Sequence, residues 1–434
     1  MLTDRYGLEL STSSELSRDA YVDATDRMLG TYANAEERLA EALEADPGFA
    51  VAHAAQARHH QLMARGAQAR SAAERAVELA GGATAREQQH VEILKHLVSG
   101  AVPRSLELTR EHLVDHPLDA FVLSPAASVF GTIGFSGRIG RESEMLSLLE
   151  PLAVHYGDDW WFQAAYAFAL VETGQWERGR DLVQLSLDQR PDSPNAAHVL
   201  SHALYEGGAD QESLEFMAGF LPESDPASPL HCHLWWHYSL LLMADGQTAA
   251  AWQAFSQNCM PGQTTSPPIN VVTDASSYLW RSEVAGAPRN RGAWQSVRDY
   301  YEESFEAPIV FVDAHAGLAY AALGETESLE ACITQLQELG EEGKLPAETT
   351  AASLTRGYEA YAREQWDSAI DALQPMIPQL VRIGGSRAQR DLVVNTLLSA
   401  YVKADRSAEA QAVLDGMHRH PTRPVAGLNN RHPA

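Results

Sequence analysis

The 434-residue sequence has few cysteines and few basic residues, and both shortages narrow what the protein can be. Its three cysteines, Cys232, Cys259 and Cys332, are far apart and odd in number, so they form neither a disulfide framework nor a paired-cysteine metal motif. The 32 lysines and arginines face 58 aspartates and glutamates, which gives a net charge of −26. Such an acidic chain is a poor candidate for binding nucleic-acid phosphates or an anionic membrane, and we expect neither partner.

Long apolar runs are missing as well. The longest, from Leu234 to Ala244, is interrupted by His237 and is too short to span a bilayer. Asp4 and Arg5 precede any apolar segment, so no signal peptide is visible. Together with the low cysteine content, these features predict a cytoplasmic protein. The glycine-rich motifs of nucleotide-binding proteins and the G-x-S-x-G motif of hydrolases are also missing from the sequence.

What the chain has is helical periodicity and a repeat. Ala, Leu, Glu, Gln and Arg dominate, whereas alternating runs of Val, Ile and Thr are nearly missing. In residues 161–191, Ala167, Gly174, Trp176 and Gly179 stand at positions 8, 15, 17 and 20 of a tetratricopeptide repeat. The small residues let two antiparallel helices approach closely, and Gly174 permits the turn between them. Turns recur every 34 to 41 residues, with one double interval, at Gly174, Gly208, Gly246, Gly324, Glu364 and Asp405.

The repeat predicts an all-α fold, a right-handed α-solenoid of tetratricopeptide-like helix pairs, with about 14 to 18 helices curled around a concave pocket. We expect one such superhelix over residues 1–420 and a flexible tail over 421–434. Residues 257–293 interrupt the array with four prolines and many Gly, Ser and Thr. We expect a loop and a short helix around Asp274 to Glu283 that closes over the pocket as a lid. The alternative for this segment is an exposed linker.

Histidine is concentrated in one part of the chain, because five of the 17 histidines fall within the 40 residues from His198 to His237. His198, His202 and Glu206 are spaced i, i+4, i+8, so they share one face of a helix. His233 and His237 form another i, i+4 pair on the first helix of the next repeat. The repeat register turns both faces toward the concavity, so we expect four imidazoles to converge there.

Three interpretations of these histidines stay open. Two H-x-x-x-H pairs on adjacent helices can chelate a divalent transition metal, which makes His198, His202, His233 and His237 the candidate metal ligands. The same groups can perform acid–base chemistry without a metal, which is the interpretation we favour slightly, so no cofactor is expected. The histidines can also simply pack between helices and hydrogen-bond to the backbone.

Six segments, in order along nearly the whole chain, resemble the tetratricopeptide repeat protein 38 family. They are the opening with Gly7 and Leu10-Ser11-Thr12-Ser13-Ser14, AAHVLSHALYEGG (196–208), HLWWHYSLLLMADG (233–246), DASSYLWR (274–281), FVDAHAGLAYAALG (311–324) and GGSRAQRDL (384–392). The first H-x-x-x-H helix departs from the family, which commonly continues with Val-Xaa-Glu-Met where this chain has Ala-Leu-Tyr-Glu-Gly. The resemblance implies an α-solenoid and a cytosolic setting, and it implies no established reaction.

The polar residues of these segments form the predicted site. We predict catalytic roles for His198, His202, His233, His237, Asp274 and His315, and substrate-binding roles for Trp161, Tyr205, Glu206, Trp236, Arg281, Asp313 and Arg390. Acid–base histidines, orienting aspartates and an anchoring arginine suit a hydrolase, lyase or isomerase, and none of these is singled out. We therefore expect an enzyme or a small-molecule-binding protein. The alternative is a non-catalytic scaffold that binds a peptide in the groove, and either could be a homo-oligomer.

Overall fold

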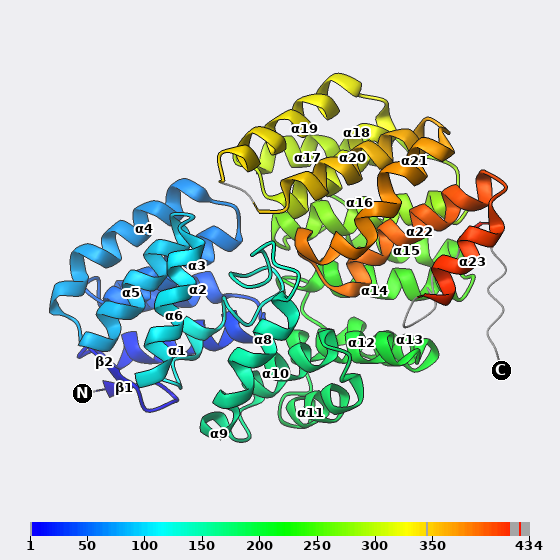
Figure 1. Cartoon of the computed structure of the whole chain (residues 1–434). Helices are drawn as coiled ribbons and strands as arrows, with labels where there is room; N and C mark the ends of the chain where they lie inside the picture. The colour runs from blue at the N-terminus through cyan, green and yellow to red at the C-terminus, as the bar shows by residue number, and fades with distance from the viewer. Residues whose placement is uncertain (1, 344–345, 417–424, 427–434) are drawn as a thin grey trace. The chain divides into compact units, whose positions relative to one another are not determined.

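The computed structural model describes residues 2–343, 346–416 and 425–426, and these residues are helical almost throughout (Figure 1). Their α-helices are numbered α1 to α23, beside one antiparallel strand pair, β1 (Leu2–Thr3) and β2 (Glu9–Leu10). The all-α solenoid prediction is therefore confirmed. The helices outnumber the predicted 14 to 18 because some connections contain short helices such as α7 (Ala120–Leu123) and α9 (Ala153–Tyr156). Most of the predicted tail, 421–434, lies outside the described residues.

The chain divides into two compact units. Unit 1 consists of Met1–Ser136, Glu142–Leu200 and Ser224–Pro229, and unit 2 of Gly137–Arg141, Ser201–Glu223 and Leu230–Ala434. The division falls inside one continuous helix, α12 (Pro194–Gly207). The prediction of a single superhelix over residues 1–420 concerns the placement of the two units relative to each other, and it stays a prediction. Within the described residues, no helix combines the length and apolar character needed to cross a bilayer.

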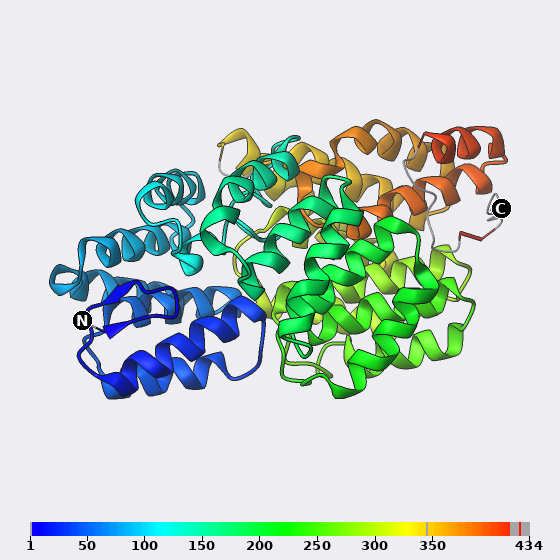
Figure 2. The same cartoon turned by 90° about the horizontal axis from the view of Figure 1, so that it is seen from below.

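Unit 1 is built from helices that pack against their neighbours in sequence, notably α1 on α2, α3 on α4, α5 on α6 and α10 on α11 (Figures 1 and 2). Its first core is rich in alanine, which brings the helix backbones close together. The helices are α1 (Glu15–Gly30), α2 (Ala35–Ala45), α3 (Ala50–Leu62), α4 (Gly66–Leu79), α5 (Ala85–Val98), α6 (Val102–Asp115), α8 (Arg141–Leu149), α10 (Trp160–Glu172) and α11 (Trp176–Gln189).

Unit 2 continues the same pairwise packing, with α14 on α15, α16 on α17, α20 on α21 and α22 on α23. A ten-residue 3-10 helix, Gln374–Ile383, precedes α22. The helices are α13 (Asp210–Phe220), α14 (His231–Ala244), α15 (Thr248–Asn258), α16 (Pro268–Val284), α17 (Arg291–Ser304), α18 (Val310–Leu323), α19 (Thr326–Glu341), α20 (Glu348–Ala362), α21 (Trp366–Leu373), α22 (Arg387–Lys403) and α23 (Ser407–Asp415).

The predicted turns have the backbone conformation that reverses the chain after a helix. All six positions have a left-handed, positive φ: Gly174 (85°), Gly208 (70°), Gly246 (81°), Gly324 (76°), Glu364 (60°) and Asp405 (58°). Glycine adopts this conformation without a steric penalty, and an acidic residue with a Cβ adopts it at some cost. The repeat register deduced from sequence is thus confirmed at every turn position.

The small residues of the repeat also act as predicted. A Cβ added at Gly179 on α11 would lie 2.9 Å from the carbonyl oxygen of Ala167 and 2.5 Å from Cγ2 of Val171, both on α10. Gly179 and Ala167 are therefore the point where the two helices touch, and Ser186 adds a 2.6 Å hydrogen bond to the carbonyl of Trp160. The same closeness occurs where Gly357 on α20 meets Leu373 on α21.

The segment 257–293 differs from its prediction. Only its connections are irregular, because α16 begins at Pro268, where a proline suits the first helical turn, and continues to Val284. The helix packs against α14, α17, α18 and α22, and most of its residues are buried. It is a layer of the helix array rather than a lid or an exposed linker. The sequence did not predict this helix for two reasons. A proline-rich loop precedes it, and apolar and polar residues are mixed on all of its faces because protein surrounds it.

Replacing Gly179 with Ala should destabilise the protein by about 1–3 kcal/mol, because the new methyl group meets a backbone oxygen that cannot move without separating α10 and α11. Urea unfolding followed by circular dichroism measures this change. The matched control is Gly219→Ala in α13, where an added Cβ has no neighbour within 4 Å and alanine should be neutral or slightly stabilising. Equal effects of the two substitutions would contradict the close-contact role of Gly179.

Candidate functional site

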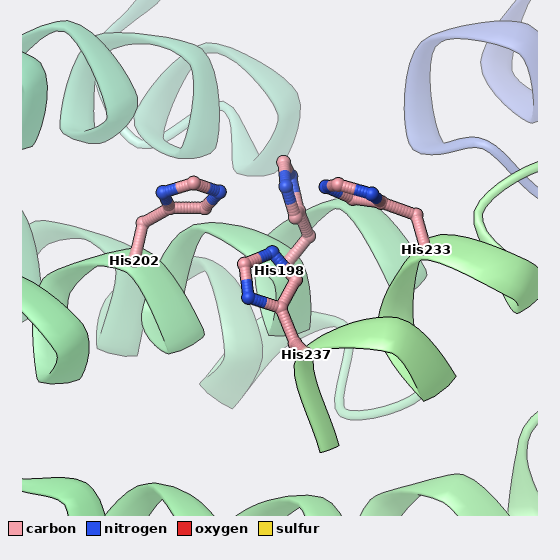
Figure 3. A group of neighbouring side chains, drawn as sticks. All are labelled: His198, His202, His233 and His237. Atoms are coloured by element: carbon pink, nitrogen blue, oxygen red, sulfur yellow. The ribbon is translucent and has the colours of Figure 1, made fainter. Parts of the chain in front are cut away.

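Two helices bring four histidines together. His198 and His202 lie one turn apart on α12, and His233 and His237 lie one turn apart on α14. Because α12 is one continuous helix, it fixes His198 relative to His202. Each histidine offers one ring nitrogen, and these four atoms all lie within 4.8 Å of one another (Figure 3). The predicted convergence of the two H-x-x-x-H pairs is thus the arrangement that the structure has.

The four imidazoles are inside the protein rather than on an open surface. None of their residues is more than 8% exposed. The ring of His237 lies 4.8 Å from that of His202 and 4.7 Å from that of His233, both nearly at right angles. Burial, together with the neighbouring His233, lowers the pKa of His202 to about 3, so this imidazole is neutral at pH 7. A neutral imidazole can act as a base or as a metal ligand.

Asp274 on α16 orients one of these histidines. Its two carboxylate oxygens each lie 2.9 Å from Nδ1 of His233, and the residue has no exposed surface. Since a carboxylate only accepts, Nδ1 of His233 carries the proton and donates it, which leaves Nε2 on the opposite side of the ring for other partners. The thiol of Cys232 also approaches Asp274, at 3.5 Å.

Trp236 packs directly on the histidines. Its indole stacks on the ring of His233 at 5.1 Å and meets the ring of His237 edge-on at 4.7 Å. The side chain is fully buried, and its Nε1 has no hydrogen-bond acceptor among the described residues. A buried donor in this condition costs free energy unless something else accepts from it.

The predicted anchoring arginines contact the backbone at the start of α22. Arg281 donates to the carbonyl oxygens of Ala388 (2.6 Å) and Gln389 (3.3 Å), and Arg390 donates to that of Gly385 (2.6 Å). Arg141, which the sequence did not suggest, donates to the carbonyl of Val381 at 2.7 Å. These contacts fix the backbone around the start of α22, whose first turn is capped by the side chain of Ser386. Their role toward a ligand stays a prediction.

Asp313 and His315, two residues apart on α18, have different surroundings. Asp313 accepts a 2.6 Å hydrogen bond from the hydroxyl of Tyr301 on α17, and burial raises the pKa of Asp313 to about 7. His315 donates from Nδ1 to the carbonyl of Phe311 at 2.7 Å, and burial lowers the pKa of His315 to about 4. Asp313 therefore pairs with a tyrosine that was not predicted, and none of its hydrogen bonds in the described residues goes to a predicted site residue.

The other predicted residues are dispersed. Tyr205 donates to Asp391 on α22, and Glu206 lies 3.6 Å from Arg387, also on α22. Trp161, in unit 1, packs against the rings of Tyr156 and Phe162. Apart from the half-buried Glu206, every predicted site residue is buried, so their common feature is burial in the helix array rather than exposure on its surface.

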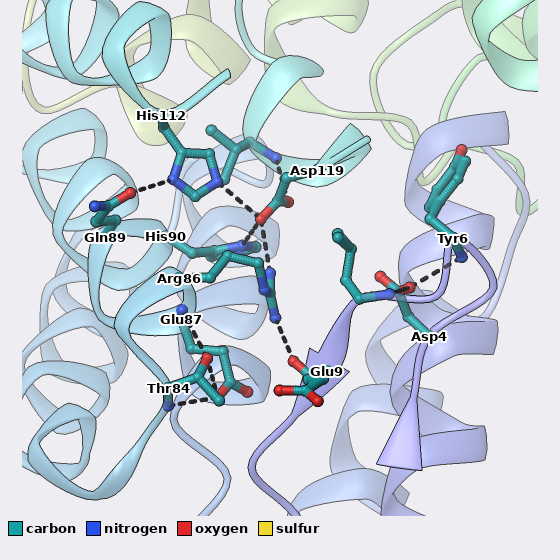
Figure 4. Close-up of polar contacts among 12 residues, drawn as sticks. Asp4, Tyr6, Glu9, Thr84, Arg86, Glu87, Gln89, His90, His112 and Asp119 are labelled. Atoms are coloured by element: carbon teal, nitrogen blue, oxygen red, sulfur yellow. Dashed lines mark hydrogen bonds and ion pairs between the residues drawn. The ribbon is translucent and has the colours of Figure 1, made fainter. Parts of the chain in front are cut away.

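Unit 1 contains a polar cluster that the sequence did not suggest, centred on Asp119 (Figure 4). One oxygen of this carboxylate accepts from Arg86 (2.7 Å), and it lies 3.2 Å from Nδ1 of His90 and 3.1 Å from Nε2 of His112. Burial alone would raise the pKa of Asp119, but the positive charge and hydrogen bonds of His90, His112 and Arg86 hold it well below its usual range. Arg86 also donates to the carbonyl of Glu9, so the cluster ties the N-terminal strand pair to α5.

A small cavity of about 150 Å³ lies at the carboxyl end of α18. Its lining includes Arg289, Arg291, Tyr320, Glu325, Glu359 and Arg363. None of its lining residues belongs to the predicted site.

No known protein-family model matches the sequence. Two solved structures of the human IFIT1 dimer are similar to the chain. The one with m7Gppp-AAAA is 12% identical, with a TM-score of 0.45, and the match covers 94% of this chain and 95% of that chain. The one with PPP-AAAA is 11% identical, with a TM-score of 0.44, covering 95% and 96%.

The structure of Naa15/Naa10 bound to HypK-THB is also similar, at 11% identity and a TM-score of 0.22, covering 92% of this chain and 68% of that chain. Scores this low carry no conclusion about the ligand or activity of this chain. The class of protein is defined by its own helix pairs and turns: it is a tetratricopeptide-like helical-repeat protein with four buried, converging histidines in α12 and α14.

The pKa of Asp313 predicts an unusual pH dependence of stability. Because burial raises this pKa from 3.8 to about 7, folding favours the neutral acid, so stability should fall as the pH rises from 4 to 7. The Asp313→Asn variant should keep the hydrogen bond from Tyr301, and its stability should not fall in this way between pH 4 and pH 7. At pH 8 the variant should be more stable than the wild type by at most about 4 kcal/mol.

Urea unfolding at pH 5 and pH 8 measures the difference, which should be much larger at pH 8. The control is Asp299→Asn on α17, whose side chain is 58% exposed and paired with Arg298 at the surface. A difference between wild type and Asp313→Asn that is independent of pH would contradict a raised pKa.

Proposed function

We propose that this protein binds a small ligand between α12, α14 and α16, and that it belongs to the tetratricopeptide repeat protein 38 family. The observation that carries the proposal is the convergence of the four histidine nitrogens within 4.8 Å. The family assignment is supported by the six sequence segments, two of which provide the H-x-x-x-H helices and one of which provides Asp274.

The energetics of burial support a binding role. Polar groups in a protein interior cost free energy unless they are well paired, and repeat helices stack equally well through apolar side chains. Here the imidazoles are grouped beside a fully buried carboxylate, and the indole N–H of Trp236 has no acceptor in the described part of the chain. A ligand that contacts these groups would offset the cost of burying them.

The proposal is for binding and does not include a reaction. His233 and Asp274 form a hydrogen-bonded pair, and the arginines predicted to anchor a substrate, Arg281 and Arg390, donate to backbone carbonyls at the start of α22. A scaffold that binds a peptide would have the same helix pairs and no need for this centre. If the histidine site binds nothing in the following experiment, the result favours the peptide-binding scaffold.

Native mass spectrometry of the full-length protein, purified without a histidine tag, should show a mass above the 47.4 kDa of the chain itself. The extra mass should be lost on denaturation and should be missing from His202→Gln and His233→Gln variants, since each removes one imidazole from the centre. His112→Gln in unit 1 is the control and should keep it. A wild type with no bound mass, and no ligand gained from a cell extract, would contradict the proposal.

A further inference from the structure

We propose that the four histidines bind one divalent transition-metal ion with a tetrahedral preference, such as Zn²⁺. This inference rests on the proposed ligand site of α12, α14 and α16 and names its ligand. The centre supplies four imidazole nitrogens, and His198, His202, His233 and His237 are the one group of three or more potential metal ligands that the described residues bring together in this way.

The four nitrogens are close enough together to reach one metal ion. A Zn–N bond of 2.0–2.1 Å places the nitrogens about 3.3 Å apart. The four nitrogens lie within 4.8 Å of one another, so each needs to move inward by less than about 1 Å, which small rotations of the histidine side chains provide. Two pairs at i, i+4 on two helices approach from both sides (Figure 3).

The chemistry of the donors selects the class of metal. All four donors are imidazoles, and no carboxylate or thiolate belongs to the group. Imidazole suits Zn²⁺, Co²⁺, Ni²⁺ and Cu²⁺, whereas Mg²⁺ and Ca²⁺ require oxygen ligands. Four protein ligands also complete a tetrahedron, which is the arrangement of closed metal sites.

Asp274 gives one of the ligands the outer partner that metal-bound histidines generally have. The carboxylate accepts from Nδ1 of His233 at 2.9 Å, so it fixes the tautomer in which Nε2 carries no proton. Asp274 itself is a positioning residue, because its oxygens are directed to the far side of the ring. This hydrogen bond holds the ring of His233 in place.

Asp119 and Asp274 are both buried, and they differ in how their charge is met. Asp119 in unit 1 has a permanent cation, the guanidinium of Arg86, at 2.7 Å. Among the described residues, Asp274 in unit 2 forms an ion pair with His233 and with no lysine or arginine. A divalent cation on the imidazoles would supply the positive charge that Arg86 supplies in unit 1.

The test is a Co²⁺ titration of the full-length chain, purified without a histidine tag and dialysed against a chelator. We expect one Co²⁺ per chain, with the intense visible absorption of tetrahedral cobalt, displaced by Zn²⁺ and accompanied by a rise in Tm. His202→Gln/His237→Gln should weaken Co²⁺ binding at least 100-fold. Asp274→Asn should weaken it about 10- to 100-fold and keep the tetrahedral spectrum, as expected of an outer partner.

His231→Gln is the matched control, because His231 lies on the same helix and contacts Asn258 outside the group; it should bind Co²⁺ as the wild type does. The proposal is overturned if the folded wild type binds no Co²⁺ or Zn²⁺, if the double variant binds equally well, or if the spectrum is octahedral. Where no metal binds but native mass spectrometry shows an organic mass that depends on His202, the metal inference fails and the proposed ligand site stands. Where neither binds, both fail.

Discussion

The carboxylate of Asp274, which has no exposed surface, constrains the histidine site of α12 and α14. Such a charge is unstable in a protein interior unless hydrogen bonds and positive charge meet it. The N–H group at Nδ1 of His233 lies within hydrogen-bonding distance of both oxygens of this carboxylate. The ring must therefore turn Nδ1 toward α16 and Nε2 away from it. Trp236 then stacks on that ring and touches His237, which links the orientation of three side chains of α14 to one residue of α16. The helix that carries Asp274, α16, packs against both α14 and α18.

The repeat geometry makes this arrangement accessible. Small residues where helices cross, such as Gly179 against Ala167, bring backbones close, and left-handed turns return the chain at regular intervals. Helices held this closely in register repeat the direction of their faces from one pair to the next. Histidines on facing sides of successive repeats can then come into contact. His202 and His237 meet in this way, with their rings 4.8 Å apart.

The sequence predicted features that depend on local spacing. The turn positions, the crossing of α10 and α11, and the facing H-x-x-x-H pairs all follow from residue intervals of 4 or about 34. Features that depend on distant partners were missed or wrong. Residues 257–293 were expected to form a lid, because their prolines indicate a break in the array. The prolines cannot reveal that the segment contains α16, a helix with other helices on several sides.

Two further cases show the same limit. Asp313 and His315 were assigned to one site, but residues two apart on a helix face different neighbours, and Asp313 meets Tyr301 on α17. In unit 1, the cluster of Arg86, His90, His112 and Asp119 has no periodic spacing that joins its three segments. Only the packing of α5, α6 and α7 brings these residues together, so no pattern in the sequence could indicate the cluster.

The central claim is that the histidines of α12 and α14 enclose a ligand that is a metal ion. Crystal diffraction from Zn²⁺-loaded protein, recorded on both sides of the zinc absorption edge, tests it most directly. The account predicts one anomalous peak about 2.0–2.1 Å from one nitrogen of each of the four rings, with Nδ1 of His233 still hydrogen-bonded to Asp274. A peak elsewhere, or no peak between the two helices of a folded protein, would contradict it.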